Sequence, residues 1–326
     1  MVDRLAVKTV DSLTTRFRLA GPGTLSGNVF ITGCSGAVGS RLTLLLLKSG
    51  YKVRGVRGSK PCKVIDKNHS CEELNLLSSK TSLDLVDFKP DIMVHTAWIT
   101  TPNVFWESPL NDQWVKASKK LIKEFVQSGG KYLIVTSSCA EYSWETSIPI
   151  SETSKTSPQS RYGRSKLQLL AWVRQQEIPF LWTRTFFQFG LNEPSGRLIP
   201  SLIDALLAGR EFEVKNSNDV RDFIFIEDVI QILLKLIYKK QLGVVNLGTG
   251  SGIDVRFIAQ LISGQIGNKD LVTYSESMQL GSSVVSNTKK LLSVVDGYSW
   301  TRIDESISKT IECRLKENFG KQSTAF

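Results

Sequence analysis

The sequence is poor in the residues that hold disulfide-rich proteins and metal centres together. Its 326 residues include five cysteines and two histidines, and no two cysteines have Cys-x-x-Cys spacing. An odd number of cysteines, scattered from Cys34 to Cys313, argues against a disulfide framework and favours a reducing compartment. With so few histidines, the sequence predicts that the protein has no zinc site.

Long apolar runs are also lacking. Apolar stretches are a few residues long, which is too short to span a membrane, and no apolar block of a signal peptide begins the chain. Arg16 and Arg18 among Ser and Thr fit a transit peptide, whereas Asp3 and Asp11 oppose one. We therefore expect a cytoplasmic enzyme with residues 1–25 as an extra N-terminal arm and with no membrane contact.

No run of five like charges occurs, although the chain is basic. Lys and Arg number 41 and Asp and Glu 31, a formal net charge of +10. This surplus suits ligands that carry phosphate. Because it is spread along the whole chain, it indicates a solvated surface rather than a groove for nucleic acid. No nucleic-acid partner is predicted.

Apolar segments of strand length alternate with helical patterns over the first 185 residues. Such alternation predicts an α/β fold, with a doubly wound parallel sheet of the Rossmann type joined by right-handed crossovers. The expected strands are Val29–Thr32, Tyr51–Val56, Ile92–Thr96, Tyr132–Thr136 and Phe180–Arg184, and the expected helices are Val38–Lys48, Asn111–Gln127 and Tyr162–Gln176.

The pattern becomes mixed after about Gly190. We expect a dinucleotide-binding domain over residues 26–190 and a smaller mixed α/β C-terminal lobe over 191–326 that binds substrate. No linker rich in Pro, Gly or Ser separates them, which leaves room for the chain to cross back to the sheet. The helices expected in this part are Leu198–Leu207 and Glu227–Tyr238, and the short strands are Phe212–Val214, Phe223–Ile226 and Val244–Leu247.

A glycine-rich segment follows the first expected strand and opens the first helix. The glycines permit a tight turn, a close approach of backbone N–H groups to a pyrophosphate, and close packing of helix on strand. The helix N-terminus adds positive potential for the anion. This placement favours a dinucleotide site over a plain turn. The segment is Gly33-Cys34-Ser35-Gly36-Ala37-Val38-Gly39.

The end of the second expected strand decides which dinucleotide is favoured. An NAD site normally carries an acidic residue ~20 residues beyond the glycines, where it binds the ribose hydroxyls. Here the strand end contains Arg54 and Arg57 and no acid. Because arginines bind a 2′-phosphate with charge-assisted hydrogen bonds, NADP(H) is favoured, with Arg57 as first choice and Arg54 as second. NAD(H), with both arginines merely on an exposed strand end, is the alternative.

A tyrosine and a lysine stand four residues apart, at Tyr162 and Lys166, which places them on one face of a helix. A phenol has a pKa of ~10 and acts as an acid–base catalyst near neutrality only when a cation stabilises its anion. Lys166, helped by the charge of an oxidised nicotinamide, could supply that charge and could also hold the ribose. Ser138 follows the strand Tyr132–Thr136, at the sheet edge where ligands bind, and could hold a carbonyl oxygen. The alternative is that Ser137 and Ser138 cap the strand and Tyr162 packs on the surface.

These motifs occur together in the order typical of one enzyme family. The chain resembles the extended short-chain dehydrogenase/reductase family, the epimerases, dehydratases and reductases of nucleotide sugars, over roughly residues 28–310. The matching parts are Gly33-x-x-Gly36-x-x-Gly39, His95-Thr96-Ala97, Ser138, Tyr162-x-x-x-Lys166, and the segments 198–203, 220–224 and 246–250.

The resemblance implies roles for individual residues. Ser138, Tyr162 and Lys166 would form the catalytic trio, and Tyr162 and Lys166 would also contact the cofactor together with Ala97. Arg221 would hold the diphosphate of a nucleotide-sugar substrate, to which a guanidinium can bind in a bidentate manner; a surface ion pair is its alternative role. The base of the nucleotide would lie against Leu198, Ile199 and Pro200.

The sequence departs from the family pattern at two places. The asparagine that usually opens the helix before the fifth strand is replaced in Trp114-Val115-Lys116-Ala117-Ser118. The asparagine that commonly follows the arginine of the sixth strand is also missing, because Arg184 precedes Thr185-Phe186-Phe187. The first change puts a proton-relay role of that asparagine in doubt, and the second prevents the identity of the sugar from being carried over.

The family contains several reactions, and the residues favour one of them. The acidic pair of dehydratases is replaced by Cys139 and Ala140, with Glu141 one position later. A basic second strand suits a reductase that uses NADPH, so we expect reduction of a 4-keto-deoxysugar nucleotide, similar to the enzymes that finish abequose-type sugars. An NAD-dependent epimerase is the alternative, and a non-catalytic NADP-binding sensor or scaffold is the third hypothesis. Family members often dimerise through helices corresponding to Asn111–Gln127 and Tyr162–Gln176, which leaves a homodimer open.

Overall fold

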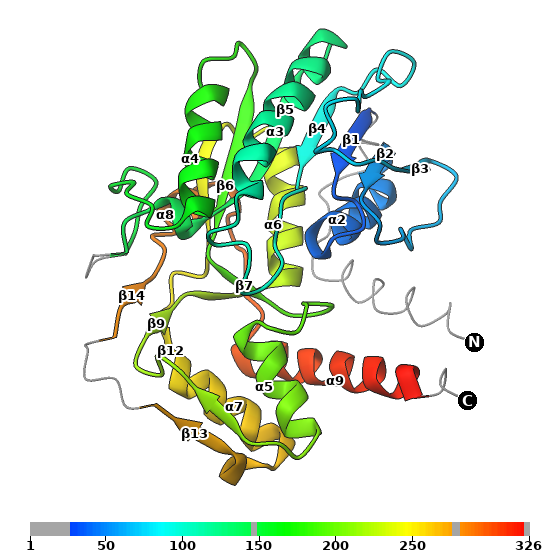
Figure 1. The fold of residues 1–326 in the computed structure, drawn as a ribbon. Coiled ribbons are helices and arrows are strands. Elements are labelled where there is room, and N and C mark those ends of the chain that lie inside the picture. Colours follow the sequence, from blue (N-terminus) through cyan, green and yellow to red (C-terminus); the bar gives the residue numbers. More distant parts are fainter. Residues whose placement is uncertain (1–26, 145–148, 276–280, 323–326) are drawn as a thin grey trace.

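A seven-stranded parallel sheet forms the centre of the protein (Figure 1). The computed structural model describes residues 27–144, 149–275 and 281–322, so the expected arm over residues 1–25 lies outside the described residues. The strand order, β11-β6-β5-β4-β1-β2-β3, confirms the predicted doubly wound fold. The strands are β1 (Asn28–Thr32), β2 (Lys52–Arg57), β3 (His69–Glu73), β4 (Ile92–His95), β5 (Tyr132–Ser138), β6 (Phe180–Thr185) and β11 (Gly243–Leu247).

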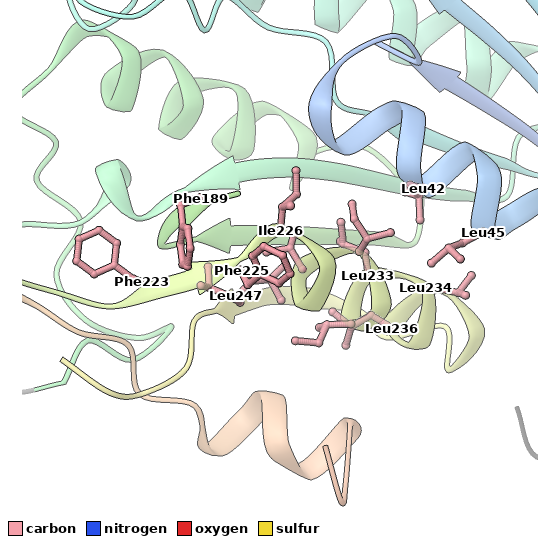
Figure 2. Packing of buried hydrophobic residues seen from close by; sticks show 14 of the residues in the cluster. Leu42, Leu45, Phe189, Phe223, Phe225, Ile226, Leu233, Leu234, Leu236 and Leu247 are labelled. Atoms are coloured by element: carbon pink, nitrogen blue, oxygen red, sulfur yellow. The ribbon is translucent and has the colours of Figure 1, made fainter. Parts of the chain in front are cut away.

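Helices cover both faces of this sheet. On one face α2 (Ala37–Lys48) packs against α6 (Ile226–Tyr238), and on the other α3 (Leu110–Gln127) packs against α4 (Arg161–Val173). Figure 2 shows Leu42 and Leu45 of α2 beside the leucines of α6. A fully buried leucine contributes roughly 2 kcal/mol to folding, so these interlayer contacts hold the helices on the sheet.

The strands are apolar on both sides because both sides are covered. On β1, Val29 and Ile31 belong to the core under α2 and α6, whereas Phe30 points into the core under α3 and α4. Leu133 and Ile134 of β5 divide between the two cores in the same way. Successive side chains of a strand point to opposite faces, so each strand reads as a continuous apolar run.

Two strands differ from the sequence expectations. β3 was not predicted, because its sequence, His69–Glu73, is polar and it lies at the edge of the sheet. β11 was expected among the short strands of the C-terminal part, but it pairs with β6 and forms the other edge of the central sheet. The chain thus returns to the sheet after α6, and α8 (Lys289–Val294) packs beside β11.

The remaining elements form a smaller mixed α/β lobe at the carboxyl ends of the strands (Figure 1). Its helices α5 and α7 pack on each other and on α9. In the described parts of the chain, no helix combines the length and apolar character that crossing a membrane requires. The lobe's elements are β7 (Phe187–Phe189), α5 (Leu198–Leu207), β8 (Phe212–Val214), β9 (Val220–Arg221), β10 (Phe223–Phe225), β12 (Ile253–Asp254), α7 (Val255–Ile266), the 3₁₀ turn Lys269–Leu271, β13 (Val272–Tyr274), β14 (Ser283–Val284) and α9 (Ile303–Gln322).

Candidate active site

A cavity of ≈ 990 Å³ lies at the carboxyl ends of the central strands, the edge at which parallel α/β sheets bind ligands. Most of the predicted site residues line this cavity. The described lining does not include Arg54, Pro200 or Arg221. The predicted site residues that line it are Gly33, Ser35, Gly36, Ala37, Val38, Gly39, Arg57, Ala97, Ser138, Tyr162, Lys166, Leu198 and Ile199.

The glycine loop has the geometry that a pyrophosphate site requires. Gly33 has a φ of +74°, and a Cβ on Gly39 would lie 2.1 Å from the Gly33 carbonyl oxygen, so only glycine fits either position. Helix α2 starts immediately afterwards, with no side chain capping its N-terminus and no acidic residue in its first turn. Its N–H groups and positive dipole end are therefore available to an anion.

Tyr162 reaches the cavity from the first turn of α4, which Ser160 caps by accepting a hydrogen bond from the Gly163 amide. A Cβ on Gly163 would lie 2.2 Å from the Ala140 carbonyl oxygen, so the helix packs directly on the 3₁₀ turn Cys139–Glu141 that follows β5. This close approach brings Tyr162 and Ser138 together in the wall of the cavity. Phe105 packs edge-on against the Tyr162 ring, with centroids 5.1 Å apart.

Lys166 lies one turn further along α4 and is buried. Its Nζ donates a hydrogen bond of 3.1 Å to the Thr136 carbonyl and lies 3.8 Å from the ring centroid of Trp98. The Tyr162 ring centroid is 5.8 Å from the same nitrogen. Burial lowers the pKa of Lys166 to about 7, and the charge of Glu141 opposes this shift.

In the protein alone, the pKa of Tyr162 is raised. Burial dominates, because it disfavours the phenolate, while the positive charge of Arg197 lowers the pKa. The lowering that was predicted from Lys166 therefore needs a further positive charge beside the phenol.

The sequence that carries these site residues matches the model of a known protein family. The model of the NAD dependent epimerase/dehydratase family matches residues 29–248, which include the glycine loop, Ser138, Tyr162 and Lys166. The chain belongs to this family.

Two relatives of this chain have names that describe enzymes of nucleotide sugars. A UDP-glucose 4-epimerase of Lactobacillus helveticus is 26% identical over 258 residues, covering 69% of this chain and 77% of the relative. A GDP-6-deoxy-D-talose 4-dehydrogenase of Aggregatibacter actinomycetemcomitans is 26% identical over 306 residues, covering 89% and 98%.

Solved structures of the family share the fold. The epimerase Mth375 of Methanothermobacter thermautotrophicus has a TM-score of 0.81 at 21% identity, covering 93% of this chain and 96% of its own. MoeE5, solved in complex with UDP-glucose and NAD, has a TM-score of 0.76 at 25% identity, covering 90% and 100%.

This family member departs from the usual pattern around Lys166. Trp114, at the position where an asparagine was expected, lines the cavity and stacks on Trp98 with centroids 6.0 Å apart. The Trp98 indole N–H donates to the Asn111 side chain at 2.8 Å, which fixes the ring over the lysine. The Trp98 ring thus covers the ammonium group, and Trp114 supports that ring by stacking on it. Nothing in the chain's local pattern marks Trp98 as a partner of Lys166.

The predicted arginines differ in position. Arg57 lines the cavity, but its guanidinium donates to the Glu73 carboxylate at 2.6 Å. Glu73 ends β3, which pairs in register with β2, and it also lines the cavity. An acid therefore lies at this end of the cavity after all, contributed by a strand that the sequence did not reveal. Arg54 is held by Glu72 and the Asp84 carbonyl instead.

Arg221 lies next to the cavity without lining it. Its guanidinium donates to Asp219 and to Ser282, and it lies 5.5 Å from the ring centroid of Trp144. Trp144 itself lines the cavity. The assignment of Arg221 to a substrate diphosphate stays a prediction, as does the assignment of Pro200 to the base pocket.

The structure adds charged groups that the sequence analysis missed. Glu193 and Arg197, in the segment between β7 and α5, line the cavity and form an ion pair of 3.4 Å. Burial raises the pKa of Glu193 to about 7, and the charge of Arg197 opposes the shift. Glu141, in contrast, is completely buried against Arg184 at 2.7 Å, outside the cavity lining. Glu141 therefore stabilises the structure beneath the site through its ion pair with Arg184.

Proposed function

We propose that the protein is an NAD(P)-dependent oxidoreductase that transfers a hydride to or from C4 of a nucleotide-activated sugar. The observation that carries the proposal is that Ser138, Tyr162 and Lys166 line one cavity together with the glycine loop. The names of both relatives, a 4-epimerase and a 4-dehydrogenase, refer to the same carbon.

The chain's own residues have complementary roles in this proposal. Ser138 orients the oxygen on C4, and the Tyr162 hydroxyl gives that oxygen a proton or takes it away. Lys166 holds positive charge beside the phenol, and its low pKa makes that charge sensitive to its surroundings. A bound nicotinamide would supply or accept the hydride, and its oxidised form would add positive charge to the site. The indole of Trp98 covers the ammonium, and Trp114 stacks on that indole.

We propose reduction of a 4-keto-deoxysugar nucleotide with NADPH as the first candidate. Its support is Arg57, which lines the cavity at the end of β2 where the 2′-phosphate of NADP would lie. The second candidate is an NAD-dependent 4-epimerase. Glu73 favours it, because a carboxylate 2.6 Å from Arg57 can accept hydrogen bonds from ribose hydroxyls and would repel a phosphate.

Isotope transfer distinguishes the two candidates. The protein is incubated with a panel of nucleotide 4-keto-6-deoxysugars and NADPH carrying deuterium at C4 of the nicotinamide. The first candidate predicts a loss of NADPH absorbance matched by deuterium on C4 of the sugar. In a parallel reaction, UDP-glucose and UDP-galactose are each mixed with catalytic NAD.

Interconversion of these sugars with no net change of cofactor would favour the epimerase. If the protein binds either dinucleotide and turns over none of the sugars, hydride transfer at C4 is refuted and a non-catalytic role is left. The Tyr162→Phe variant serves as the inactive control in both reactions.

A further inference from the structure

Three of the five cysteines meet at one edge of the central sheet, although they are far apart in the sequence. Cys34 follows β1 in the glycine loop, Cys62 lies in the connection after β2, and Cys71 is on β3. Their sulfur atoms all lie within 4.8 Å of one another, and the sulfurs of Cys34 and Cys71 are 3.2 Å apart. We call these three residues the cysteine cluster.

A histidine lies on the same side of the sheet edge as this cluster. His69 is two residues before Cys71 on β3, and residues two apart on a strand share a face. Its Nδ1 is 3.1 Å from the Val64 carbonyl, which can only accept, so Nδ1 carries the proton and Nε2 has a free lone pair. Among the described residues this buried Nε2 has no hydrogen-bond partner. A buried acceptor without a partner is costly, so the atom is suited to a ligand.

Gly55 shows that His69 and the cluster share one small space. A Cβ on Gly55, which is in β2, would lie 2.6 Å from the Cys34 sulfur and 3.3 Å from His69 Nε2. Both atoms therefore flank the same point beside the β2 backbone. The missing side chain of Gly55 leaves the room that the Cys34 sulfur occupies.

We propose that Cys34, Cys62, Cys71 and His69 bind a thiophilic divalent cation of the zinc type. Three sulfurs and one imidazole nitrogen are a common donor set for tetrahedral zinc. With metal–sulfur bonds of about 2.3 Å, the sulfurs of such a site lie about 3.8 Å apart, and the three sulfurs lie within 4.8 Å of one another, with those of Cys34 and Cys71 at 3.2 Å. His69 Nε2 is not within 4.8 Å of all three sulfurs, so the imidazole has to move toward them to complete the donor set. The hydrogen bond from His69 Nδ1 to a backbone carbonyl is the usual outer contact of a ligating histidine.

A pocket beside the cluster would let a cation enter, and a bound cation would connect two segments of the chain. A second pocket of ≈ 340 Å³ opens onto the cluster and is lined by Cys62, His69 and Cys71. A bound cation would tie the connection between β2 and β3 to the glycine loop, beside Arg57 at the end of the larger cavity. It would thereby stiffen the part of the site where the adenosine end of a dinucleotide would lie. The site is structural and does not depend on the reaction proposed above.

This proposal departs from the expectation of no zinc site, which rested on local spacing. A disulfide between Cys34 and Cys71 is the competing explanation of their 3.2 Å separation. It would leave the third sulfur and His69 Nε2 without a function, and it would need an oxidant. A cation accounts for all four groups.

Cobalt substitution tests the site directly. The full-length protein is purified without oxygen, stripped with a chelator, and titrated with Co²⁺ while the visible spectrum is recorded. We expect sulfur-to-cobalt charge-transfer bands and the intense d–d bands of tetrahedral cobalt, saturating at one cobalt per chain and abolished by Zn²⁺. Cys62→Ser should weaken cobalt binding at least about tenfold and reduce the charge-transfer bands, since it removes a ligand. The matched control is Cys313→Ser, on α9 and outside the cluster, which should leave the spectrum unchanged.

Other outcomes would overturn the proposal. One is an absence of these bands in the fully reduced protein, and another is a Cys62→Ser spectrum equal to that of Cys313→Ser. A Cys34–Cys71 disulfide in peptides mapped from anaerobically purified protein would favour the competing explanation. If Cys62→Ser fails to fold, His69→Gln replaces it, and the d–d bands must then shift while the charge-transfer bands persist.

Discussion

At the scale of single residues, burial shifts the pKa values of Tyr162 and Lys166 more than the neighbouring charges do. Tyr162 and Lys166 were paired from their spacing alone, and both line the cavity. Their pKa values shift in opposite directions for the same reason, because burial disfavours the charged form of each group. The proton transfer that we propose for Tyr162 therefore depends on the charge that a bound cofactor would add.

Tyr162→Phe tests the proton-transfer role. Removing the hydroxyl should lower kcat by about 10²–10⁴-fold, the usual contribution of a general acid or base, and leave the Kd of the cofactor nearly unchanged. Both are measured with NADPH, by absorbance for turnover and by fluorescence for binding. Tyr238→Phe, at a tyrosine 42% exposed on α6, is the matched control and should behave as wild type. A large loss of cofactor binding in Tyr162→Phe would instead indicate a structural role.

Arg57 and Glu73 together should set the cofactor preference. Arg57→Ala should weaken NADPH binding by roughly tenfold or more, which corresponds to one charge-assisted hydrogen bond, and change NADH binding much less. Glu73→Gln should strengthen NADPH binding, because it removes the carboxylate that competes for the guanidinium. Titration of each variant with both cofactors gives the ratios.

Arg54 provides the control for these variants. It is on the same strand but outside the described cavity lining, so Arg54→Ala should leave both cofactor affinities unchanged. If Arg57→Ala lowered the affinities for NADPH and NADH equally, the assignment of Arg57 to a phosphate would be wrong.

At the scale of elements, the segment that leads from β7 into α5 carries a buried carboxyl group at the cavity wall. Glu193 has its pKa raised from 4.5 to about 7, chiefly by burial, so the folded protein holds this proton more tightly than the unfolded chain does. Its contribution to stability is complete below pH 4.5 and is lost as the pH rises through about 7.

Glu193→Gln should remove this pH dependence. The free energy of unfolding of the wild type relative to the variant should fall by an amount on the order of 1–3 kcal/mol between about pH 5 and pH 8. Urea denaturation at a series of pH values measures it. Glu211→Gln, the same change at an exposed position, is the control and should run parallel to the wild type. Parallel curves for wild type and Glu193→Gln would contradict the raised pKa.

Elements with a strong local pattern could be predicted from the sequence, whereas those without one could not. The apolar runs of β1, β4, β5 and β6 were all identified, because both faces of these strands are buried. β3 was missed, since its exposed edge position permits a polar sequence. Because β3 was not predicted, the sequence did not show that Glu73 lies beside Arg57.

At the scale of the whole molecule, one carboxylate joins the central sheet to the smaller lobe. Asp222, between β9 and β10, is completely buried and accepts hydrogen bonds from Thr249 and Gly250 after β11 and from Ser286 after β14. The resemblance to the family included the segments around Asp222 and Thr249, and their contact gives these segments a physical reason to occur together.

Asp222→Asn should destabilise the folded protein by about 3 kcal/mol, because the amide replaces a charged acceptor of several hydrogen bonds and leaves donors unpaired. The matched control is Asp254→Asn, at an exposed aspartate of β12, which should change stability by less than about 0.5 kcal/mol. Urea denaturation gives both values. A cost for Asp222→Asn as small as that of the control would show that the two parts are held together by other contacts.

The sequence by itself determined what depends on neighbours in the chain. The glycine loop, the Tyr162–Lys166 pair on one helical turn and the alternation of strands and helices are local patterns, and each has one compatible geometry. Only the tertiary structure decided which distant residues meet: Glu73 beside Arg57, the Trp98 ring over Lys166, and three cysteines with His69 around Gly55. Contacts of this kind depend on strand order and on the path of the connections, and no spacing along the chain records them.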